Sequence, residues 1–337
     1  MTINRRSFLK LFAVSGCAAV GGVALAKRDQ LASWCGDGQY RVKASKTAIG
    51  THVDITAIGA SKYEVEDAIE AAFNDVSEME HLLSRYDHKS PVCELNDEGC
   101  IEHGPNALAQ LCRVCEAYYR ETDGAFDITV APLIDLFKSA ANEGRQPSEK
   151  EIDHWMASSK HRPTIDGDRI VLKEGMKLTF DGCAPGLIAD RAAAMLISRG
   201  IVDFLINAGG EIRTSGHPKN AEKWRIAIED PNKHGHYPGY LTFNAGAVST
   251  SGNYEIFYGE DRLYHHIVDA RTGHSPNAFT SVTVTAPTAL EADILSTALF
   301  VMSPQEALNY VKNHPHIACL IITRDGEKIV SPNFVVA

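Results

Sequence analysis

The sequence predicts an α+β protein in which helices and strands are mixed along the chain, without the strict alternation of a doubly wound parallel sheet. Three observations lead to this fold class. The 337 residues are 44% hydrophobic and 23% charged, as in ordinary globular proteins. Segments of helical and of strand periodicity follow one another in irregular order. No G-x-G-x-x-G follows an apolar strand and no G-x-x-x-x-G-K-[ST] occurs, which excludes the two common nucleotide-binding patterns of doubly wound folds.

Strands and helices are predicted in chain order from the period of the apolar residues. The first half should contain strands between 40 and 58 with a break at 43–46, and helices over 63–83 and 106–121. Asp123-Gly124 ends the second helix, and Ser148 can cap a third that begins at Pro147. The second half should contain strands at 177–180 and 204–206 around a helix over 187–199, strands within 224–284, helices over 290–301 and 304–313, and a hairpin of 318–323 and 328–330.

The N-terminal segment has the pattern of an export signal. Arg5 and Arg6 precede Phe8-Leu9-Lys10, and a mildly apolar stretch, short for a membrane span, ends in Ala24-Leu25-Ala26. The pattern is typical of a cleaved signal peptide, and the arginine pair indicates the twin-arginine route. We therefore expect a signal at 1–26, one domain at 27–337 and a periplasmic location. The alternative left open is a lipoprotein box that ends at Cys17, which would tether the protein to a membrane.

Charge and cysteine usage exclude several classes of protein. The formal net charge is −10 and no run of Lys and Arg exceeds two residues, so nucleic acid is not an expected partner. Cys112 and Cys115 form a C-x-x-C in a helical segment, but no His follows, which excludes attachment of c-type haem. We expect both to be buried helical cysteines. A disulfide between Cys93 and Cys100 is left open.

One predicted helix carries a carboxylate and a hydroxyl at helical spacing. Asp293 and Thr297 are four residues apart, so they share a helix face. Two hard oxygen donors suit Mg²⁺, which uses few protein ligands and leaves positions for a substrate phosphate. The alternative is a helix start that carries stabilising acids, and this segment alone favours that alternative.

Histidines and glycines mark three further candidate segments. His265 and His266 would project to opposite faces of a strand, so only one of them can enter a given cleft as a general base. Arg271 follows and could meet a phosphate. The paired glycines Gly209 and Gly210 allow close backbone approach to a ligand. Each pattern alone also occurs in purely structural segments.

Taken together in chain order, these segments resemble the ApbE family of FAD:protein FMN transferases, from about residue 49 to the C-terminus. The matching motifs are Ile49-Gly50-Thr51, Leu83-Ser84-Arg85-Tyr86, Gly124-Ala125-Phe126-Asp127, Ala189-Asp190-Arg191-Ala192, Asn207-Ala208-Gly209-Gly210-Glu211, Val248-Ser249-Thr250-Ser251-Gly252, His265-His266-Ile267 and Ala292-Asp293-Ile294-Leu295-Ser296-Thr297. The resemblance implies an α+β fold of mixed sheets packed with helices, of the T-fold type, with a cleft for FAD between them.

The resemblance also implies the chemistry and its residues. The family moves FMN from FAD to a Thr or Ser hydroxyl of an acceptor protein and releases AMP, with a divalent metal, Mg²⁺, at the pyrophosphate. Asp293, Thr297 and the carbonyl of Ala184 would be metal ligands, and His266 and Asp293 the catalytic residues. The expected FAD-binding residues are Tyr86 as a stacking aromatic, together with Asp127, Ala184, Asn207, Gly209, Gly210, Glu211, Thr250, Ser251, His265 and Arg271.

One segment departs from the family pattern, which usually has D-[LF]-G-[GA]-I-A-K-G-Y. Here Thr179 stands in place of the first Asp, Asp181 in place of a Gly and Pro185 in place of the Lys. The loop should still form, because Pro is tolerated in the first turn of a helix. The missing ammonium leaves two alternatives to transfer: a protein that binds FAD without transferring FMN, and a metal-dependent FAD pyrophosphatase.

Overall fold

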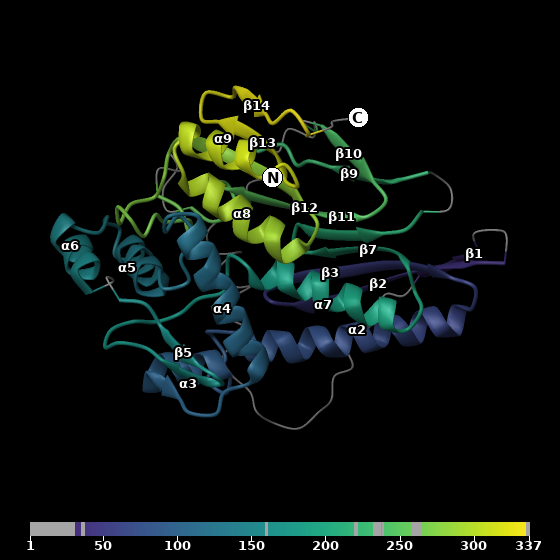
Figure 1. Cartoon of the computed structure of the whole chain (residues 1–337), viewed down its shortest axis with the longest axis horizontal. Coiled ribbons are helices and arrows are strands. Elements are labelled where there is room, and N and C mark those ends of the chain that lie inside the picture. The colour runs from purple at the N-terminus through teal and green to yellow at the C-terminus, as the bar shows by residue number, and fades with distance from the viewer. Residues whose placement is uncertain are drawn as a thin grey trace.

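A nine-stranded antiparallel sheet forms the centre of the protein, shown in Figure 1 as a computed structural model. The structure describes residues 31–34, 38–158, 161–218, 222–231, 237, 239–257 and 264–334. In spatial order the strands of the sheet are β1 (Leu31–Trp34), β2 (Tyr40–Ala48), β3 (Thr51–Gly59), β7 (Asp203–Ala208), β8 (Glu211–Ser215), β11 (Gly246–Gly252), β12 (Phe279–Ala286), β13 (Ala318–Thr323) and β14 (Lys328–Val330).

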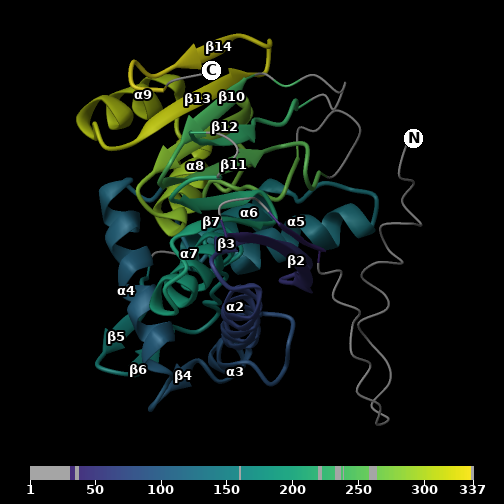
Figure 2. The same ribbon diagram turned by 90° about the vertical axis from the view of Figure 1, so that its right-hand side faces the viewer.

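Three helices pack on one face of this sheet: α2 (Lys62–Leu83), α7 (Ala184–Ser198) and α8 (Ala289–Val301), as both views show (Figures 1 and 2). They follow from the sequence locally. Aliphatic residues of α2 recur every three or four positions and are buried, and Ser61 caps the helix by accepting the Glu64 N–H. Thr288 caps α8 in the same way through the Glu291 N–H. The helix layer and the sheet thus enclose the main apolar core.

A short hairpin covers part of the opposite face. Strands β9 (Trp224–Ala227) and β10 (Tyr240–Phe243) pair antiparallel and contribute to a second apolar cluster. Alternation along β13 explains both cores: Ile321 packs toward the helices, whereas Leu320 and Ile322 pack toward the hairpin cluster.

The remaining elements lie at one end of the sheet, on the left in Figure 1, apart from α9, which follows α8 near β13. They are α3 (Pro91–Glu98), α4 (Asn106–Glu121), α5 (Ala131–Asn142), α6 (Glu149–Ser158), α9 (Pro304–Asn313) and a small antiparallel sheet of β4 (Cys100–Ile101), β6 (Arg169–Val171) and β5 (Thr164–Asp166). Within the described residues, no helix is both long and apolar enough to cross a membrane.

The α+β prediction is confirmed, and most predicted elements match within a few residues, including the final hairpin with its turn at Gly326. Cys112 and Cys115 are buried in α4 as predicted, and Cys93 and Cys100 are free thiols. The N-terminal signal, with Cys17, lies outside the described residues.

Two predictions of strand boundaries are wrong. Strand β2 runs without a break through 43–46, because Lys46 reaches over to donate hydrogen bonds to α2 at the Phe73 carbonyl and Ser77. Residues 177–180 are buried but form no strand. The side chain of Asn96 replaces a neighbouring strand there, since its amide accepts the Leu178 N–H at 2.7 Å and donates to the Leu178 carbonyl at 2.9 Å. Helices α3 and α5 were not predicted.

Candidate functional site

The segment Asp181–Gly186, which leads into α7 and includes Ala184, contacts both side chains expected to bind the metal, Asp293 and Thr297. Its first residue faces Arg85 and influences His266 electrostatically. A Cβ on Gly182 would lie 3.4 Å from Oγ1 of Thr297, and the N–H of Gly186 donates to Asp293. The segment that departs from the family pattern is therefore the one that joins the parts of the site.

Pro185 is tolerated at the start of α7, as predicted. It lies in the first turn of the helix, where its missing N–H leaves no bond unmade. Ala184, whose carbonyl is expected to bind metal, is the first residue of the same turn and is buried.

Asp293 and Thr297 occupy successive turns of α8 on the side that faces this segment. The N–H of Gly186 donates to Oδ2 of Asp293 at 2.8 Å. This bond requires a close crossing of α7 and α8, because a Cβ on Gly186 would lie 2.4 Å from the Ala289 carbonyl oxygen. The predicted common helix face is confirmed, and tertiary packing adds the start of α7 opposite it.

A chain of hydroxyl groups continues from Thr297 into the sheet. Ser251 Oγ lies 3.2 Å from Thr297 Oγ1 and 2.8 Å from Ser296 Oγ, which in turn lies 3.0 Å from Ser249 Oγ. Alternate residues of β11 thus point toward α8. Thr250 points to the other side and pairs with Thr283 at 2.9 Å. Of the two β11 residues expected at the FAD site, Ser251 is beside the metal-ligand candidates and Thr250 is not.

Three carboxyl groups concentrate negative charge in this buried region. Burial and the nearby Asp190 raise the pKa of Asp293 to about 7, although the Gly186 N–H opposes this. Burial and Asp293 raise the pKa of Glu211 well above its usual range, and burial raises that of Asp190. Arg213 pairs with Asp190 at 3.2 Å. A bound divalent cation would relieve this repulsion, and the oxygen donors of Asp293 and Thr297 fit Mg²⁺.

The two adjacent histidines have different surroundings, although this segment is not the strand that the prediction assumed: in the described part of the chain, His265 forms only an isolated bridge with Phe257. The ring of His265 is fully buried against Phe300, and its Nε2 donates to the Pro276 carbonyl at 2.9 Å. Its Nδ1 has no partner, and burial lowers its pKa to about 4. His265 contributes no exposed surface, so a direct FAD contact stays a prediction.

His266 is the better-placed base. Its Nδ1 lies 3.1 Å from the Ile256 carbonyl oxygen, which can only accept a hydrogen bond, so Nδ1 carries the proton. Nε2 is then the unprotonated nitrogen. Burial lowers the pKa of the ring, which favours the neutral form, and the hydrogen bond to Ile256 and the charge of Asp181 partly oppose this shift. A neutral imidazole with a free Nε2 can take a proton from a hydroxyl.

An arginine missed by the sequence analysis organises the aromatic side of the site. Arg85 is nearly buried and bridges two acids, with Asp135 at 3.0 Å and Asp181 at 3.3 Å. Its guanidinium lies 4.9 Å from the ring centroid of Tyr86, which is 63% exposed. Lys138 Nζ also lies 5.7 Å from the centroid, and the exposed ring is consistent with the predicted role of Tyr86 as a stacking aromatic. The motif Leu83-Ser84-Arg85-Tyr86 contained this signal, but no role was inferred for the arginine.

The glycine pair forms the β7–β8 turn. Asn207 Oδ1 accepts the Gly210 N–H at 2.8 Å, and Gly209 has a φ of 75°. A Cβ on Gly209 would lie 2.7 Å from Thr51, so glycine is required here by the neighbouring strand turn as well as by the backbone.

Two predicted FAD-binding residues are committed to other partners. Asp127 accepts from Arg162 at 2.8 Å and from the Thr129 backbone and hydroxyl at 2.7 and 2.8 Å. Arg271 pairs with Asp269 at 3.0 Å and approaches Glu306 at 3.7 Å. Both carry structural ion pairs in this conformation, and their contact with FAD stays a prediction.

Asp190 is a second residue whose role the sequence analysis missed. Its carboxylate accepts the N–H groups of Ala289 and Leu290, at 3.0 and 2.9 Å, at the start of α8. It thus ties α7 to the positive end of the helix that carries Asp293. The sequence analysis assigned Asp190 only to the motif Ala189-Asp190-Arg191-Ala192.

Comparison with known proteins agrees with this geometry. The model of the ApbE family matches residues 49–321. The FAD:protein FMN transferase of Escherichia coli K12 is 31% identical over 271 residues, which cover 76% of this chain and 77% of the relative. The FAD:protein FMN transferase of Vibrio cholerae serotype O1 is 30% identical over 321 residues, which cover 91% of this chain and 95% of the relative.

Solved structures show the same fold. The crystal structure of the ApbE protein from Thermotoga maritima superposes with a TM-score of 0.78 at 30% identity, over 87% of this chain and 98% of that one. The apo form of the flavinyl transferase ApbE from Pseudomonas stutzeri superposes with a TM-score of 0.73 at 25% identity, over 87% of this chain and 95% of that one.

Proposed function

The chain belongs to the ApbE family, and from this premise we propose that it is an FAD:protein FMN transferase, which moves FMN from FAD to a Thr or Ser hydroxyl of an acceptor protein. The acceptor oxygen forms a bond to the phosphorus on the FMN side of the pyrophosphate. The bond from that phosphorus to the bridging oxygen breaks, and AMP leaves. The observation that carries the proposal is the convergence of Asp293, Thr297 and the start of α7 beside the acidic cluster.

The side chains have separable parts in this reaction. His266 Nε2 takes the proton of the acceptor hydroxyl, because Nδ1 is already protonated and held by the Ile256 carbonyl. Tyr86 offers its exposed ring to the flavin, and Arg85 holds the Tyr86 ring in place. Asp293 and Thr297, with the Ala184 carbonyl, would hold Mg²⁺. When bound, that ion supplies neutralisation of the charge on the phosphates, which phosphoryl transfer needs more than covalent catalysis.

The segment Asp181–Gly186, which differs from the family pattern, is physically compatible with transfer. Pro185 leaves the helix start intact, and the added negative charge of Asp181 is balanced by Arg85. The family's lysine is absent, and Arg85 places a cation against this segment. We infer that the site keeps its donor geometry with a different charge arrangement.

The test is release of AMP by the purified chain with FAD and Mg²⁺, with and without an acceptor domain that carries a Thr. Transfer predicts AMP only when the acceptor is present, in equal amount to flavin bound covalently to that acceptor. AMP release of equal rate without acceptor would replace the proposal by FAD hydrolysis. Tight FAD binding with no AMP under any condition, across several acceptors, would replace it by a flavin-binding protein. Asp293→Ala serves as the inactive reference.

We also propose export through the twin-arginine route and a periplasmic location. The support is the sequence of residues 1–26 alone. Substitution of Arg5 and Arg6 by Lys should leave the chain uncleaved in the cytoplasm, and cell fractionation with immunoblotting measures this. Release of the mature chain in soluble periplasmic extract would argue against a lipid tether at Cys17.

A further inference from the structure

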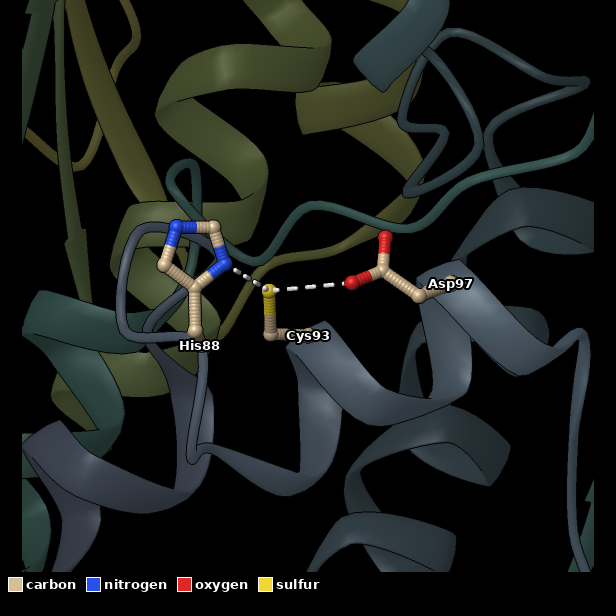
Figure 3. Close-up of side chains that lie close together, drawn as sticks. All are labelled: His88, Cys93 and Asp97. Carbon is tan, nitrogen blue, oxygen red and sulfur yellow. Dashed lines mark hydrogen bonds between the residues drawn. The ribbon is translucent and has the colours of Figure 1, made fainter.

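His88, Cys93 and Asp97 form a second cluster of metal-type ligands, distinct from the phosphoryl-transfer site (Figure 3). Cys93 and Asp97 are one turn apart on α3, so they share a helix face. His88 belongs to the turn between α2 and α3. Among the residues that the structure describes, this is the one group of three His, Cys, Asp or Glu side chains whose ligand atoms all lie within 4.8 Å of one another.

The distances are close to those of a metal centre. Cys93 Sγ lies 3.9 Å from His88 Nδ1 and 3.9 Å from Asp97 Oδ2. In a tetrahedral zinc site with ligand bonds of about 2.0–2.3 Å, neighbouring ligand atoms are separated by roughly 3.3–3.8 Å. Small rotations of two exposed side chains would therefore close the cluster around an ion.

The Cys93 thiol has more potential hydrogen-bond partners than its single proton can satisfy. The sulfur also lies 3.9 Å from the carbonyl oxygen of Arg85. The sulfur thus has two oxygen acceptors and one ring nitrogen around it, its single S–H can donate to only one of them, and all three contacts are long for hydrogen bonds. A cation at the centre would satisfy the sulfur, the nitrogen and the carboxylate together.

The surrounding turn holds these ligands in register. Ser90 caps α3 by accepting the Cys93 N–H at 2.9 Å, and its hydroxyl donates to the Ser84 carbonyl at 2.5 Å. Cys93 is buried, whereas His88 and Asp97 are exposed. The cluster therefore has a fixed inner ligand and an open outer side through which an ion can enter.

We propose that His88 Nδ1, Cys93 Sγ and Asp97 Oδ2 bind a transition-metal ion of the Zn²⁺ class, with water or the Arg85 carbonyl as fourth ligand. The mixed nitrogen, sulfur and oxygen set favours Zn²⁺ or Co²⁺ over Mg²⁺, which prefers oxygen alone. Binding replaces the S–H proton by the metal and releases that proton to solvent. The ion fixes residues 84–90, the turn that carries Arg85 and Tyr86, and so connects a metal to the flavin side of the proposed active site.

Co²⁺ is the probe that separates this site from the oxygen site at Asp293, because only a thiolate gives a sulfur-to-cobalt charge-transfer absorption in the near ultraviolet. The purified full chain, freed of metal by chelation, is titrated with Co²⁺. We expect one thiolate-bound Co²⁺ per chain and loss of the absorption when Zn²⁺ is added. The absorption should persist in Asp293→Ala.

Variants locate the ligands. Cys93→Ser should abolish the charge-transfer absorption, and His88→Ala and Asp97→Asn should weaken Co²⁺ binding at least about tenfold. Cys100→Ser is the matched control: Cys100 is a free thiol 3.4 Å from Glu102, outside the cluster, and its loss should change nothing. No absorption in the wild type, or an equal absorption in Cys93→Ser, would overturn the proposal.

Two further measurements guard against misfolding and test the effect on the turn. Far-ultraviolet circular dichroism confirms that each variant is folded, and Asp97→Asn changes only an exposed side chain. Hydrogen exchange of the amides in residues 84–90 should slow when Zn²⁺ is added to the wild type but not to Cys93→Ser. Unchanged exchange in the wild type would refute the stated link to the turn.

Discussion

Substitution of Gly186 by Ala tests the close crossing of α7 and α8 on which the proposed site depends. The added methyl would lie 2.4 Å from the Ala289 carbonyl oxygen and 2.7 Å from Cβ of Asp293. Both are parts of helix α8 that no side-chain rotation can move away. To restore a contact of 3.4 Å with the carbonyl, the helices must separate by about 1 Å.

The separation has a structural and a catalytic consequence. Overpacking of this kind costs about 1–3 kcal/mol of unfolding free energy, of which the better helix propensity of Ala recovers up to about 1 kcal/mol. The hydrogen bond from the Gly186 N–H to Asp293, now 2.8 Å, would lengthen beyond normal range. A misplacement of about 1 Å at a reacting site lowers the rate on the order of 100-fold. We therefore expect a folded but nearly inactive protein.

The assay combines thermal unfolding with FMN transfer to a Thr-bearing acceptor in excess Mg²⁺. Gly182→Ala is the control for stability, because its methyl would meet Thr297 and Phe126 at 3.4–3.7 Å, which are ordinary contacts. A melting temperature and a transfer rate equal to those of the wild type in Gly186→Ala would refute the close crossing as the element that assembles the site.

Three other perturbations follow from the site. Asp293→Asn keeps an acceptor for the Gly186 N–H but removes the charged carboxylate expected to bind Mg²⁺. Transfer should therefore fall at least about 100-fold at any Mg²⁺ concentration without loss of melting temperature, and recovery in high Mg²⁺ would contradict this. Tyr86→Ala should weaken FAD binding about 5- to 10-fold by fluorescence titration, whereas Tyr86→Phe should not; equal affinities would exclude stacking. Burial holds the pKa of His265 at about 4, below its ordinary 6.5, so between these pH values the unfolded chain binds a proton that the folded chain does not. The free energy of unfolding therefore falls as the pH drops through this window, by about 3 kcal/mol in total. Denaturant titrations should show this added loss in the wild type but not in His265→Gln, and parallel curves would refute it.

Local patterns in the sequence predicted six of the eight described helices, all except α3 and α5, because the information is contained in neighbouring residues. Ser61 and Thr288 both precede helices with a carboxylate three residues on, and both cap as such a sequence requires. Buried segments that do not pair with a neighbouring strand were harder to predict. Residues 177–180 have the composition of a strand, yet the partner of Leu178 is the side chain of Asn96, 82 residues earlier in the chain. No local period contains that pairing.

The sequence alone determined the α+β class, the family resemblance and the helix face shared by Asp293 and Thr297, because each depends on residue types at fixed spacing. It also predicted that only one of His265 and His266 enters a given cleft. Only the tertiary structure showed that the ring of His265 is fully buried, because burial of a ring depends on what packs around it. It also decided that Arg85 meets the Asp181 segment and that Asp190 meets the start of α8. Such contacts form between segments distant in sequence, where packing geometry rather than spacing sets which atoms meet.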